Sequence, residues 1–242
     1  MIEIVGLTKR HGARLAVDDA GFTAAPGRVT GFLGPNGAGK SSTLRILLGM
    51  DRADSGSALI GGTPYRKLRD PLRTVGSLLE GSGAHRSRTA RAHLTWVARS
   101  NGIAKTRVRE VLEQTGLAEV AGKRVGTFSL GMGQRLGVAA ALLGEPEVLV
   151  LDEPVNGLDP DGIRWIRRLL KDHAKTGGTV LVSSHLMSEM AETADDLVVI
   201  SAGRIVTHGP LAEVTAGHAS LEEAFFALTT PAHPARDAWS GS

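Results

Sequence analysis

The residues best suited to chemistry form a glycine-rich segment that ends in a lysine and a serine. It reads Gly34-Pro35-Asn36-Gly37-Ala38-Gly39-Lys40-Ser41 and matches the pattern G-x-x-x-x-G-K-[ST]. Such glycines let backbone N–H groups point at phosphate oxygens, and a helix that starts at the lysine adds partial positive charge. We expect Lys40 to reach the β- and γ-phosphates, Ser41 to ligate Mg²⁺ and Ser42 to donate to the α-phosphate. The alternative is a glycine-rich turn that matches by chance.

A pair of acidic residues provides the second candidate for chemistry. Asp152 and Glu153 directly follow the apolar run Val148–Leu151. A carboxylate at the end of a buried strand is costly unless a cation or a hydrogen-bond donor accompanies it. We expect Asp152 to bind Mg²⁺, directly or through water, and Glu153 to polarise a water for attack on a γ-phosphate. The alternative is an acidic pair that only opens a turn at Pro154.

Strand-like and helix-like segments alternate around these motifs, which is typical of an α/β core with parallel strands. The strand-like runs are Ile2–Gly6, Val29–Leu33, Leu149–Leu151, Thr179–Ser183 and Leu197–Ile200. We expect the first of them to be a short edge strand. Val29–Leu33 leads into the glycine-rich loop, and Ser41–Leu48 has the pattern of a helix that follows it. This strand–loop–helix context is the one in which the loop binds phosphate.

One domain is expected over residues 1–228, with a helical subdomain at about 84–146 and a flexible tail at 229–242. The helical part shows helical periodicity and almost no β-branched runs. After the acidic pair, Asp159-Pro160 has the pattern of a helix N-cap followed by proline at the first helical position. The tail is rich in Pro, Ala and Ser, as frayed chain ends often are.

The composition excludes several classes of function. The 242 residues are 42% hydrophobic, and 28 Lys and Arg against 25 Asp and Glu leave a net charge of +3, so no nucleic-acid partner is expected. The sequence has no cysteine, which excludes disulfides and thiolate-bound metals. The N-terminus lacks the pattern of a secretory signal, and no apolar run approaches the roughly 20 residues of a membrane span. We expect the isolated chain to be soluble.

Three further motifs complete a series. Residues 128–135 read Phe-Ser-Leu-Gly-Met-Gly-Gln-Arg, Asn156-Gly157-Leu158-Asp159 follows the acidic pair, and Ser183-Ser184-His185 ends a later strand. With the two motifs above, this order resembles the ABC (ATP-binding cassette) ATPase family over about residues 1–228. The resemblance implies a phosphate-loop NTPase core with a mostly parallel central sheet, an antiparallel β subdomain on the N-terminal side and an inserted helical subdomain.

The resemblance also implies how two copies would share ATP. In the family, two cassettes pack head to tail, so Ser129 and the Gly131 backbone would contact the γ-phosphate held by the opposite protomer. His185 would contact the γ-phosphate of its own site, and Asp159 would couple the two sites. The partner is a second copy or a paralogous cassette. For His185 alone, a hydrogen-bonded histidine at a strand end is the alternative, and Ser129 can also serve as a helix N-cap.

The sequence departs from the usual family pattern at three places. The signature L-S-G-G-Q is replaced by Phe128-Ser129-Leu130-Gly131-Met132, a form that resembles the subgroup of bacitracin-resistance and other antibiotic exporters. By spacing, Glu80 stands where the family has a glutamine that ligates Mg²⁺, with a solvated loop acid as the alternative. His11 stands where the family has an adenine-stacking tyrosine, with a plain loop histidine as the alternative.

The expected function is that of the ATPase subunit that drives a separate membrane permease in a drug or antibiotic exporter. The subunit would sit on the cytoplasmic face of the membrane, held there by the permease. Arg86, Arg88 and Arg91 lie in the region that approaches the membrane subunit in relatives, although such a charge run is more often a solvated surface. The alternatives are a non-transport ABC ATPase acting on ribosomes or DNA and a phosphoryl-transferase such as a nucleoside kinase.

Overall fold

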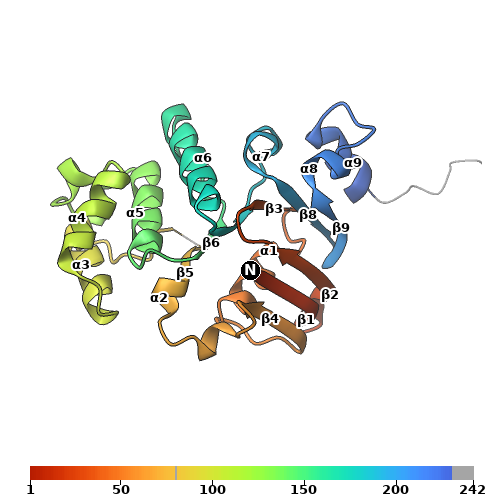
Figure 1. Ribbon diagram of the computed structural model, residues 1–242, viewed down its shortest axis with the longest axis horizontal. Coiled ribbons are helices and arrows are strands. Elements are labelled where there is room, and N and C mark those ends of the chain that lie inside the picture. Colours follow the sequence, from red (N-terminus) through yellow and green to blue (C-terminus); the bar gives the residue numbers. More distant parts are fainter. Residues whose placement is uncertain (80, 231–242) are drawn as a thin grey trace, which may run out of the picture.

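The computed structural model describes residues 1–79 and 81–230, which form an α/β fold built around two β-sheets (Figure 1). Glu80 and residues 231–242 lie outside the described residues. The predicted Mg²⁺ ligand Glu80 and most of the predicted tail therefore have no structural account. Within the described range, no helix has both the length and the apolar character that a membrane crossing requires.

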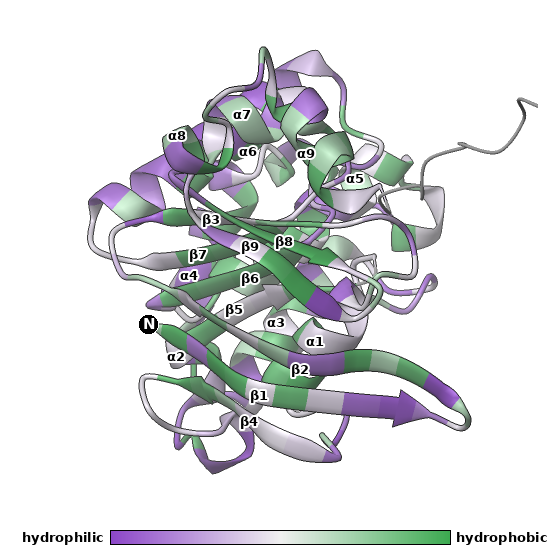
Figure 2. Ribbon diagram, turned by 90° about the vertical axis from the view of Figure 1, so that its right-hand side faces the viewer, coloured by the Kyte–Doolittle hydropathy of each residue, from purple (hydrophilic) through white to green (hydrophobic). Residues whose placement is uncertain are grey.

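The phosphate loop and the acidic pair Asp152-Glu153 both lie at the ends of strands of the larger sheet. Its strands follow the order β5 (Val75–Leu78), β6 (Val148–Asp152), β7 (Thr179–Ser183), β3 (Val29–Leu33), β8 (Asp196–Ser201) and β9 (Arg204–Pro210). All neighbours pair in parallel except β8 and β9. Every residue of β3, β6 and β7 is buried, which explains why most residues of these strands are apolar. In Figure 2 these strands form a hydrophobic layer between the helices and the second sheet.

The smaller sheet is antiparallel, in the order β2 (Arg14–Ala24), β1 (Ile2–His11) and β4 (Ser55–Ile60). The expectation that Ile2–Gly6 is a short edge strand is wrong. β1 has ten residues and lies between its two partners. Shifts in the strand register and the positive φ of Gly6, 57°, interrupt the alternation of the sequence pattern after the first residues.

Helices cover the larger sheet and extend to one side of it. They are α1 (Lys40–Leu47), α2 (Pro71–Thr74), α3 (Ala90–Ser100), α4 (Lys105–Gln114), α5 (Leu130–Leu142), α6 (Pro160–Lys175), α7 (Met187–Thr193), α8 (Leu211–Val214) and α9 (Leu221–Thr229). Short 3₁₀ turns occur at Tyr65–Lys67, Ala118–Val120 and Val125–Thr127. The predicted N-cap of α6 is confirmed, because Asp159 accepts a hydrogen bond from the Gly162 N–H at 2.8 Å and Pro160 is the first helical residue.

Helices α3, α4 and α5 pack against one another at the left of Figure 1. They share an apolar core of their own, which includes Leu94, Leu112 and Leu136, all nearly inaccessible to solvent. These helices fall within the range 84–146 that the sequence predicts to be helical; its exact limits as a subdomain stay a prediction. The mostly parallel sheet, the antiparallel sheet and the helices confirm the predicted fold class.

Candidate functional site

A pocket of about 320 Å³ opens where β3 and β6 end, and both chemical motifs line it. Residues 35–42 of the phosphate loop form one wall, and Asp152 and Glu153 form another. His11 and Arg14 reach the same pocket from the tip of the β1–β2 hairpin. The carboxyl ends of parallel strands lie at one edge of the sheet, so residues more than a hundred positions apart in the sequence meet there.

The phosphate loop joins β3 to α1 in a conformation that glycine makes possible. Gly39, the N-cap of α1, has a φ of 115°, and a Cβ at this position would lie 2.5 Å from the Ala16 carbonyl oxygen. The Lys40 ammonium group is folded over the loop and donates to the carbonyl oxygens of Gly34 at 2.5 Å and Pro35 at 3.4 Å. The Lys40 ammonium group therefore lies against the loop, in the lining of the pocket.

Lys40 is a buried cation, with 7% of its surface exposed. Burial lowers the pKa of its ammonium group, and the nearby Glu153 and Asp152 carboxylates oppose that shift. Among the described residues, the hydrogen-bond partners of Lys40 are carbonyl oxygens, so this buried cation gains a stronger interaction when a phosphate binds. The electrostatics of the pocket therefore favour an anionic ligand beside Lys40.

Asp152 lies at the end of β6 with 8% of its surface exposed. Its Oδ2 accepts a hydrogen bond from the Ser41 hydroxyl at 3.0 Å, and its Oδ1 accepts one from the Ser183 hydroxyl. A carboxylate and a hydroxyl beside a phosphate-binding loop are the donor set that Mg²⁺ takes together with nucleotide phosphates and water. Among the residues described, no three His, Asp or Glu side chains could hold a metal by themselves. The donor set therefore fits a Mg²⁺ ion that arrives with a nucleotide.

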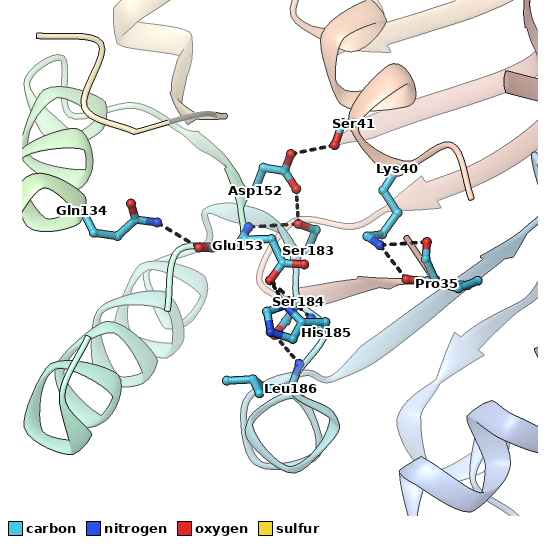
Figure 3. Close-up of polar contacts among 11 residues, drawn as sticks. Pro35, Lys40, Ser41, Gln134, Asp152, Glu153, Ser183, Ser184, His185 and Leu186 are labelled. Carbon is cyan, nitrogen blue, oxygen red and sulfur yellow. Dashed lines mark hydrogen bonds and ion pairs between the residues drawn. The ribbon is translucent and has the colours of Figure 1, made fainter. Parts of the chain in front are cut away.

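Glu153 makes hydrogen bonds with three side chains, those of Ser183, Gln134 and His185 (Figure 3). Its N–H donates to the Ser183 hydroxyl oxygen at 3.0 Å, and its carbonyl oxygen accepts from Gln134 Nε2 at 2.8 Å. The Nδ1 atom of His185 lies 2.7 Å from Glu153 Oε2. The predicted acid and the predicted histidine are therefore in contact; Glu153 lines the pocket, and His185 is not part of the lining. Gln134 was not predicted to take part in the site, although it belongs to the segment 128–135.

The β1–β2 hairpin supplies a second pair of side chains. His11 and Arg14 oppose each other across its two-residue loop, so both face the phosphate loop. His11 Nε2 lies 3.2 Å from the Ser42 hydroxyl oxygen, and Arg14 donates to the Gly37 carbonyl oxygen at 2.9 Å. Arg14 was not anticipated from the sequence. Its position opposite His11 in the hairpin is the signal that could have identified it.

Ser129, Gly131 and Asp159 also lie outside the lining of this pocket. Ser129 is exposed and caps α5 by accepting a hydrogen bond from the Met132 N–H at 3.2 Å. Gly131 packs against Gly157, where an added Cβ would lie 2.7 Å from the carbonyl oxygen. Asp159 caps α6. Within one chain, the structure does not bring these residues to the phosphate loop.

Comparisons with known proteins agree on one family. The family model described as "ABC transporter" matches residues 17–156. The bacitracin transport ATP-binding protein BcrA of Bacillus licheniformis is 42% identical over 213 residues, which cover 87% of this chain and 70% of the relative. A solved structure described as the ATP binding subunit of an ABC transporter is similar with a TM-score of 0.86 and 25% identity, covering 94% of this chain and 99% of the other.

A second solved structure shares the fold. It is described as the dimeric, post-hydrolysis state of the ATP-binding cassette MJ0796 bound to ADP and Pi. The similarity has a TM-score of 0.78 and 22% identity, and it covers 87% of this chain and 99% of the other.

Proposed function

This chain belongs to the ABC transporter family as an ATP-binding, ATP-hydrolysing subunit, and we propose that it hydrolyses ATP in the pocket between the phosphate loop and Glu153. The observation that supports this placement best is the position of the Glu153 carboxylate, which lines the same pocket as Lys40 and Ser41. In one pocket, a carboxylate can accept a proton from the attacking water, and a lysine can stabilise the negative charge of the phosphate that the water attacks.

In the proposed reaction, Glu153 accepts a proton from a water molecule as the water oxygen attacks the γ-phosphorus. The bond between that phosphorus and the β–γ bridging oxygen breaks, which yields ADP and phosphate. Lys40 binds the β- and γ-phosphates, and backbone N–H groups of the phosphate loop bind the phosphate chain, except at Pro35, which has no N–H. His185 contacts the γ-phosphate and orients Glu153, to which it is hydrogen bonded at 2.7 Å.

Other residues of the pocket would orient the nucleotide. We assign the adenine ring to His11, the α-phosphate to Ser42 and Mg²⁺ to Ser41 with Asp152, where the ion would neutralise phosphate charge. Arg14 adds a guanidinium group beside Gly37, on the phosphate side of His11. A planar guanidinium group suits phosphate oxygens, so we include Arg14 among the nucleotide-binding residues.

A second cassette would complete the site. Ser129 and Gly131 lie at the exposed start of α5, away from the pocket of their own chain. In a head-to-tail dimer with a second copy or a paralogous cassette, this turn would meet the γ-phosphate held by the partner, and Asp159 would lie between the two sites. Support comes from the dimeric cassette that shares this fold and from the solvent-exposed Ser129 at the N-terminus of α5, since a helix N-terminus suits an anion.

The subunit would act on a separate permease at the cytoplasmic face of the membrane. The relative that transports bacitracin supports an exporter of an antibiotic or a drug-like compound. Two shared ATP molecules would favour the closed cassette dimer, and this difference in binding free energy would move the permease between its states. Co-expression with the permease should bring the chain into the membrane fraction, whereas stable binding to protein-free liposomes would contradict the proposal.

Release of phosphate tests the hydrolysis itself. The purified chain should release phosphate from Mg-ATP with no acceptor present, and Lys40→Ala should abolish that release because it removes the cation at the β- and γ-phosphates. The Lys175→Ala variant, whose lysine is on the exposed surface of α6, is the matched control and should behave as the wild type. A strict requirement for an acceptor would indicate a kinase instead. Equal rates for wild type and Lys40→Ala would contradict the placement of the site.

A further inference from the structure

Gln134 connects α5 to the residue that we propose as the base. Its side-chain Nε2 donates to the Glu153 carbonyl oxygen at 2.8 Å, and only 6% of the residue is exposed (Figure 3). A buried amide in a well-formed hydrogen bond fixes the distance between the two segments that it joins. The reaction described above uses Glu153 but gives Gln134 no part.

The backbone of Glu153 needs such support. Its φ is 51°, in the left-handed region that residues other than glycine rarely adopt. Such a conformation persists when the surrounding structure holds it in place. Ser183 holds the N–H side of Glu153, with contacts of 3.0 Å to its hydroxyl oxygen and 3.2 Å to its carbonyl oxygen. Gln134 holds the carbonyl oxygen, so the two peptide groups that flank the Glu153 Cα are held from β7 and from α5.

The same helix also presents the turn that would meet the partner. Gly131 lies one helical turn before Gln134, and it packs directly on the Gly157 backbone four residues after Glu153. Ser129 caps this turn and is exposed. A shift of the turn would therefore move both Gln134 and the segment that follows Glu153. Small displacements of a reacting group have large effects on rate, because the attacking water must be aligned with the phosphorus.

We propose that Gln134 is a positioning residue that couples the Ser129 turn to the Glu153 carboxylate of the same protomer. When Ser129 of one protomer contacts the nucleotide held by the partner, the contact would position Glu153 in the protomer that carries this Ser129. ATP bound at one site would therefore position the proposed base at the other site. This inference rests on the proposed function, because it requires that Glu153 acts on ATP. It concerns the rate of hydrolysis and leaves the binding of ATP unchanged.

Two substitutions separate positioning from folding. Gln134→Met keeps the length of the side chain and removes the donor, so kcat should fall at least tenfold while the Kd for Mg-ATP stays within twofold. Gln134→Glu places a carboxylate against the Glu153 carbonyl oxygen, and its kcat at neutral pH should be lower than that of Gln134→Met. Burial raises the pKa of such a carboxyl group, and its protonated form can donate to the carbonyl. The activity of Gln134→Glu relative to wild type should therefore rise as the pH is lowered from 8 to about 5.5.

Gln114→Met is the matched control, since Gln114 is exposed at the end of α4 and its side chain is remote from the pocket. It should keep wild-type kcat. The inference is overturned if Gln134→Met retains wild-type kcat, or if kcat and ATP affinity fall by the same factor. A pH-independent ratio for Gln134→Glu also overturns it, even if Gln134→Met folds poorly. If the wild type itself releases no phosphate, the proposed function fails, which is a different result from these.

Discussion

The Nδ1 atom of His185 lies 2.7 Å from Oε2 of Glu153, and the backbone N–H of His185 donates to the same oxygen at 3.3 Å. One carboxylate oxygen is thus held twice from the end of β7, while Glu153 itself follows β6. Because β6 and β7 are paired in parallel through Asp152 and Ser183, the two side chains extend from adjacent strand ends. The sheet therefore sets the orientation of the proposed base before any substrate is bound.

Removal of the imidazole should affect the rate more than binding. In His185→Ala, the backbone N–H still holds Glu153, but the side-chain contact and the proposed contact to the γ-phosphate are lost. We expect kcat to fall by about 10- to 100-fold, with the Kd for Mg-ATP within about threefold of the wild type. Phosphate release and isothermal titration would measure the two quantities. A variant with unchanged kcat would show that His185 does not orient Glu153.

The roles of His11 and Arg14 can be told apart by how much each substitution weakens the binding of ATP, ADP and AMP. If Arg14 binds phosphate oxygens, Arg14→Ala should weaken ATP and ADP by about tenfold, or about 1.4 kcal/mol, and AMP by much less. If His11 stacks on adenine, His11→Ala should weaken all three nucleotides by a similar factor. Isothermal titration with ATP, ADP and AMP would test both assignments.

Arg10→Ala provides the control for that experiment. Arg10 is exposed on the same hairpin, one residue before His11, so its side chain points to the other face of the sheet. Its removal changes the net charge as Arg14→Ala does, but it should leave nucleotide affinity as in the wild type. If Arg10→Ala and Arg14→Ala weakened nucleotide affinity equally, the cause would be the change in net charge, and Arg14 would not be a nucleotide-binding residue.

The sequence is most informative where strands are buried on both faces. Val29–Leu33 and Thr179–Ser183 were predicted with the bounds that the structure shows, because a strand with two buried faces consists mostly of apolar and β-branched residues. β1 was misjudged because its partner β4 lies about fifty residues away, and local periodicity carries no information on such a pairing. The phosphate loop and the acidic pair could be located because their chemistry requires particular residue types at fixed spacing.

The side chains that were missed act on backbone atoms of distant segments. Gln134 donates to the carbonyl oxygen of Glu153, and Arg14 donates to that of Gly37. Every residue has a carbonyl group, so nothing in the sequence marks the carbonyl oxygens of Glu153 and Gly37 as acceptors of side-chain hydrogen bonds. For Arg14, the pairing with His11 in the hairpin is a signal of its place, whereas the contact of Gln134 with Glu153 becomes visible only in the folded structure.

Two histidines should make stability depend on pH below neutrality. Burial lowers the pKa of His93, with a smaller contribution from Arg88. Partial burial also lowers the pKa of His173, which its hydrogen bond with the Glu147 carbonyl oxygen opposes by a smaller amount. The unfolded chain therefore takes up protons first as the pH falls below the usual histidine value of about 6.5. The stability present above that pH is lost as the pH falls toward the folded-state pKa, by up to about 1.4 kcal/mol per pH unit for each proton.

Urea unfolding between pH 7.5 and 5 would measure this slope. His93→Gln should make it shallower, because Gln cannot take up a proton. His208→Gln, which changes an exposed residue on β9, is the control for the substitution itself and should keep the wild-type slope. The comparison concerns slopes, so a loss of stability in His93→Gln at every pH would not affect it. An unchanged slope in that variant would contradict the assignment to His93.

The sharpest prediction concerns the proposed base. Glu153→Gln keeps the shape of the side chain and an acceptor oxygen for His185 but loses basicity, and removal of a general base costs a factor of about 10² to 10⁴ in rate. ATP binding should persist, since Lys40, Ser41 and the loop N–H groups are unchanged.

With hydrolysis blocked, ATP should stay between the phosphate loop of one protomer and Ser129 of the other. Glu153→Gln should therefore elute as a dimer from size-exclusion chromatography in Mg-ATP at high protein concentration. Glu153→Gln combined with Ser129→Arg should elute as a monomer, because the arginine obstructs the shared phosphate. Ser100→Arg, at the exposed end of α3, is the matched control in the same background and should leave the dimer intact. Wild-type hydrolysis by Glu153→Gln would refute the mechanism, and a dimer that tolerates Ser129→Arg would refute the shared site while leaving the role of Glu153 untouched.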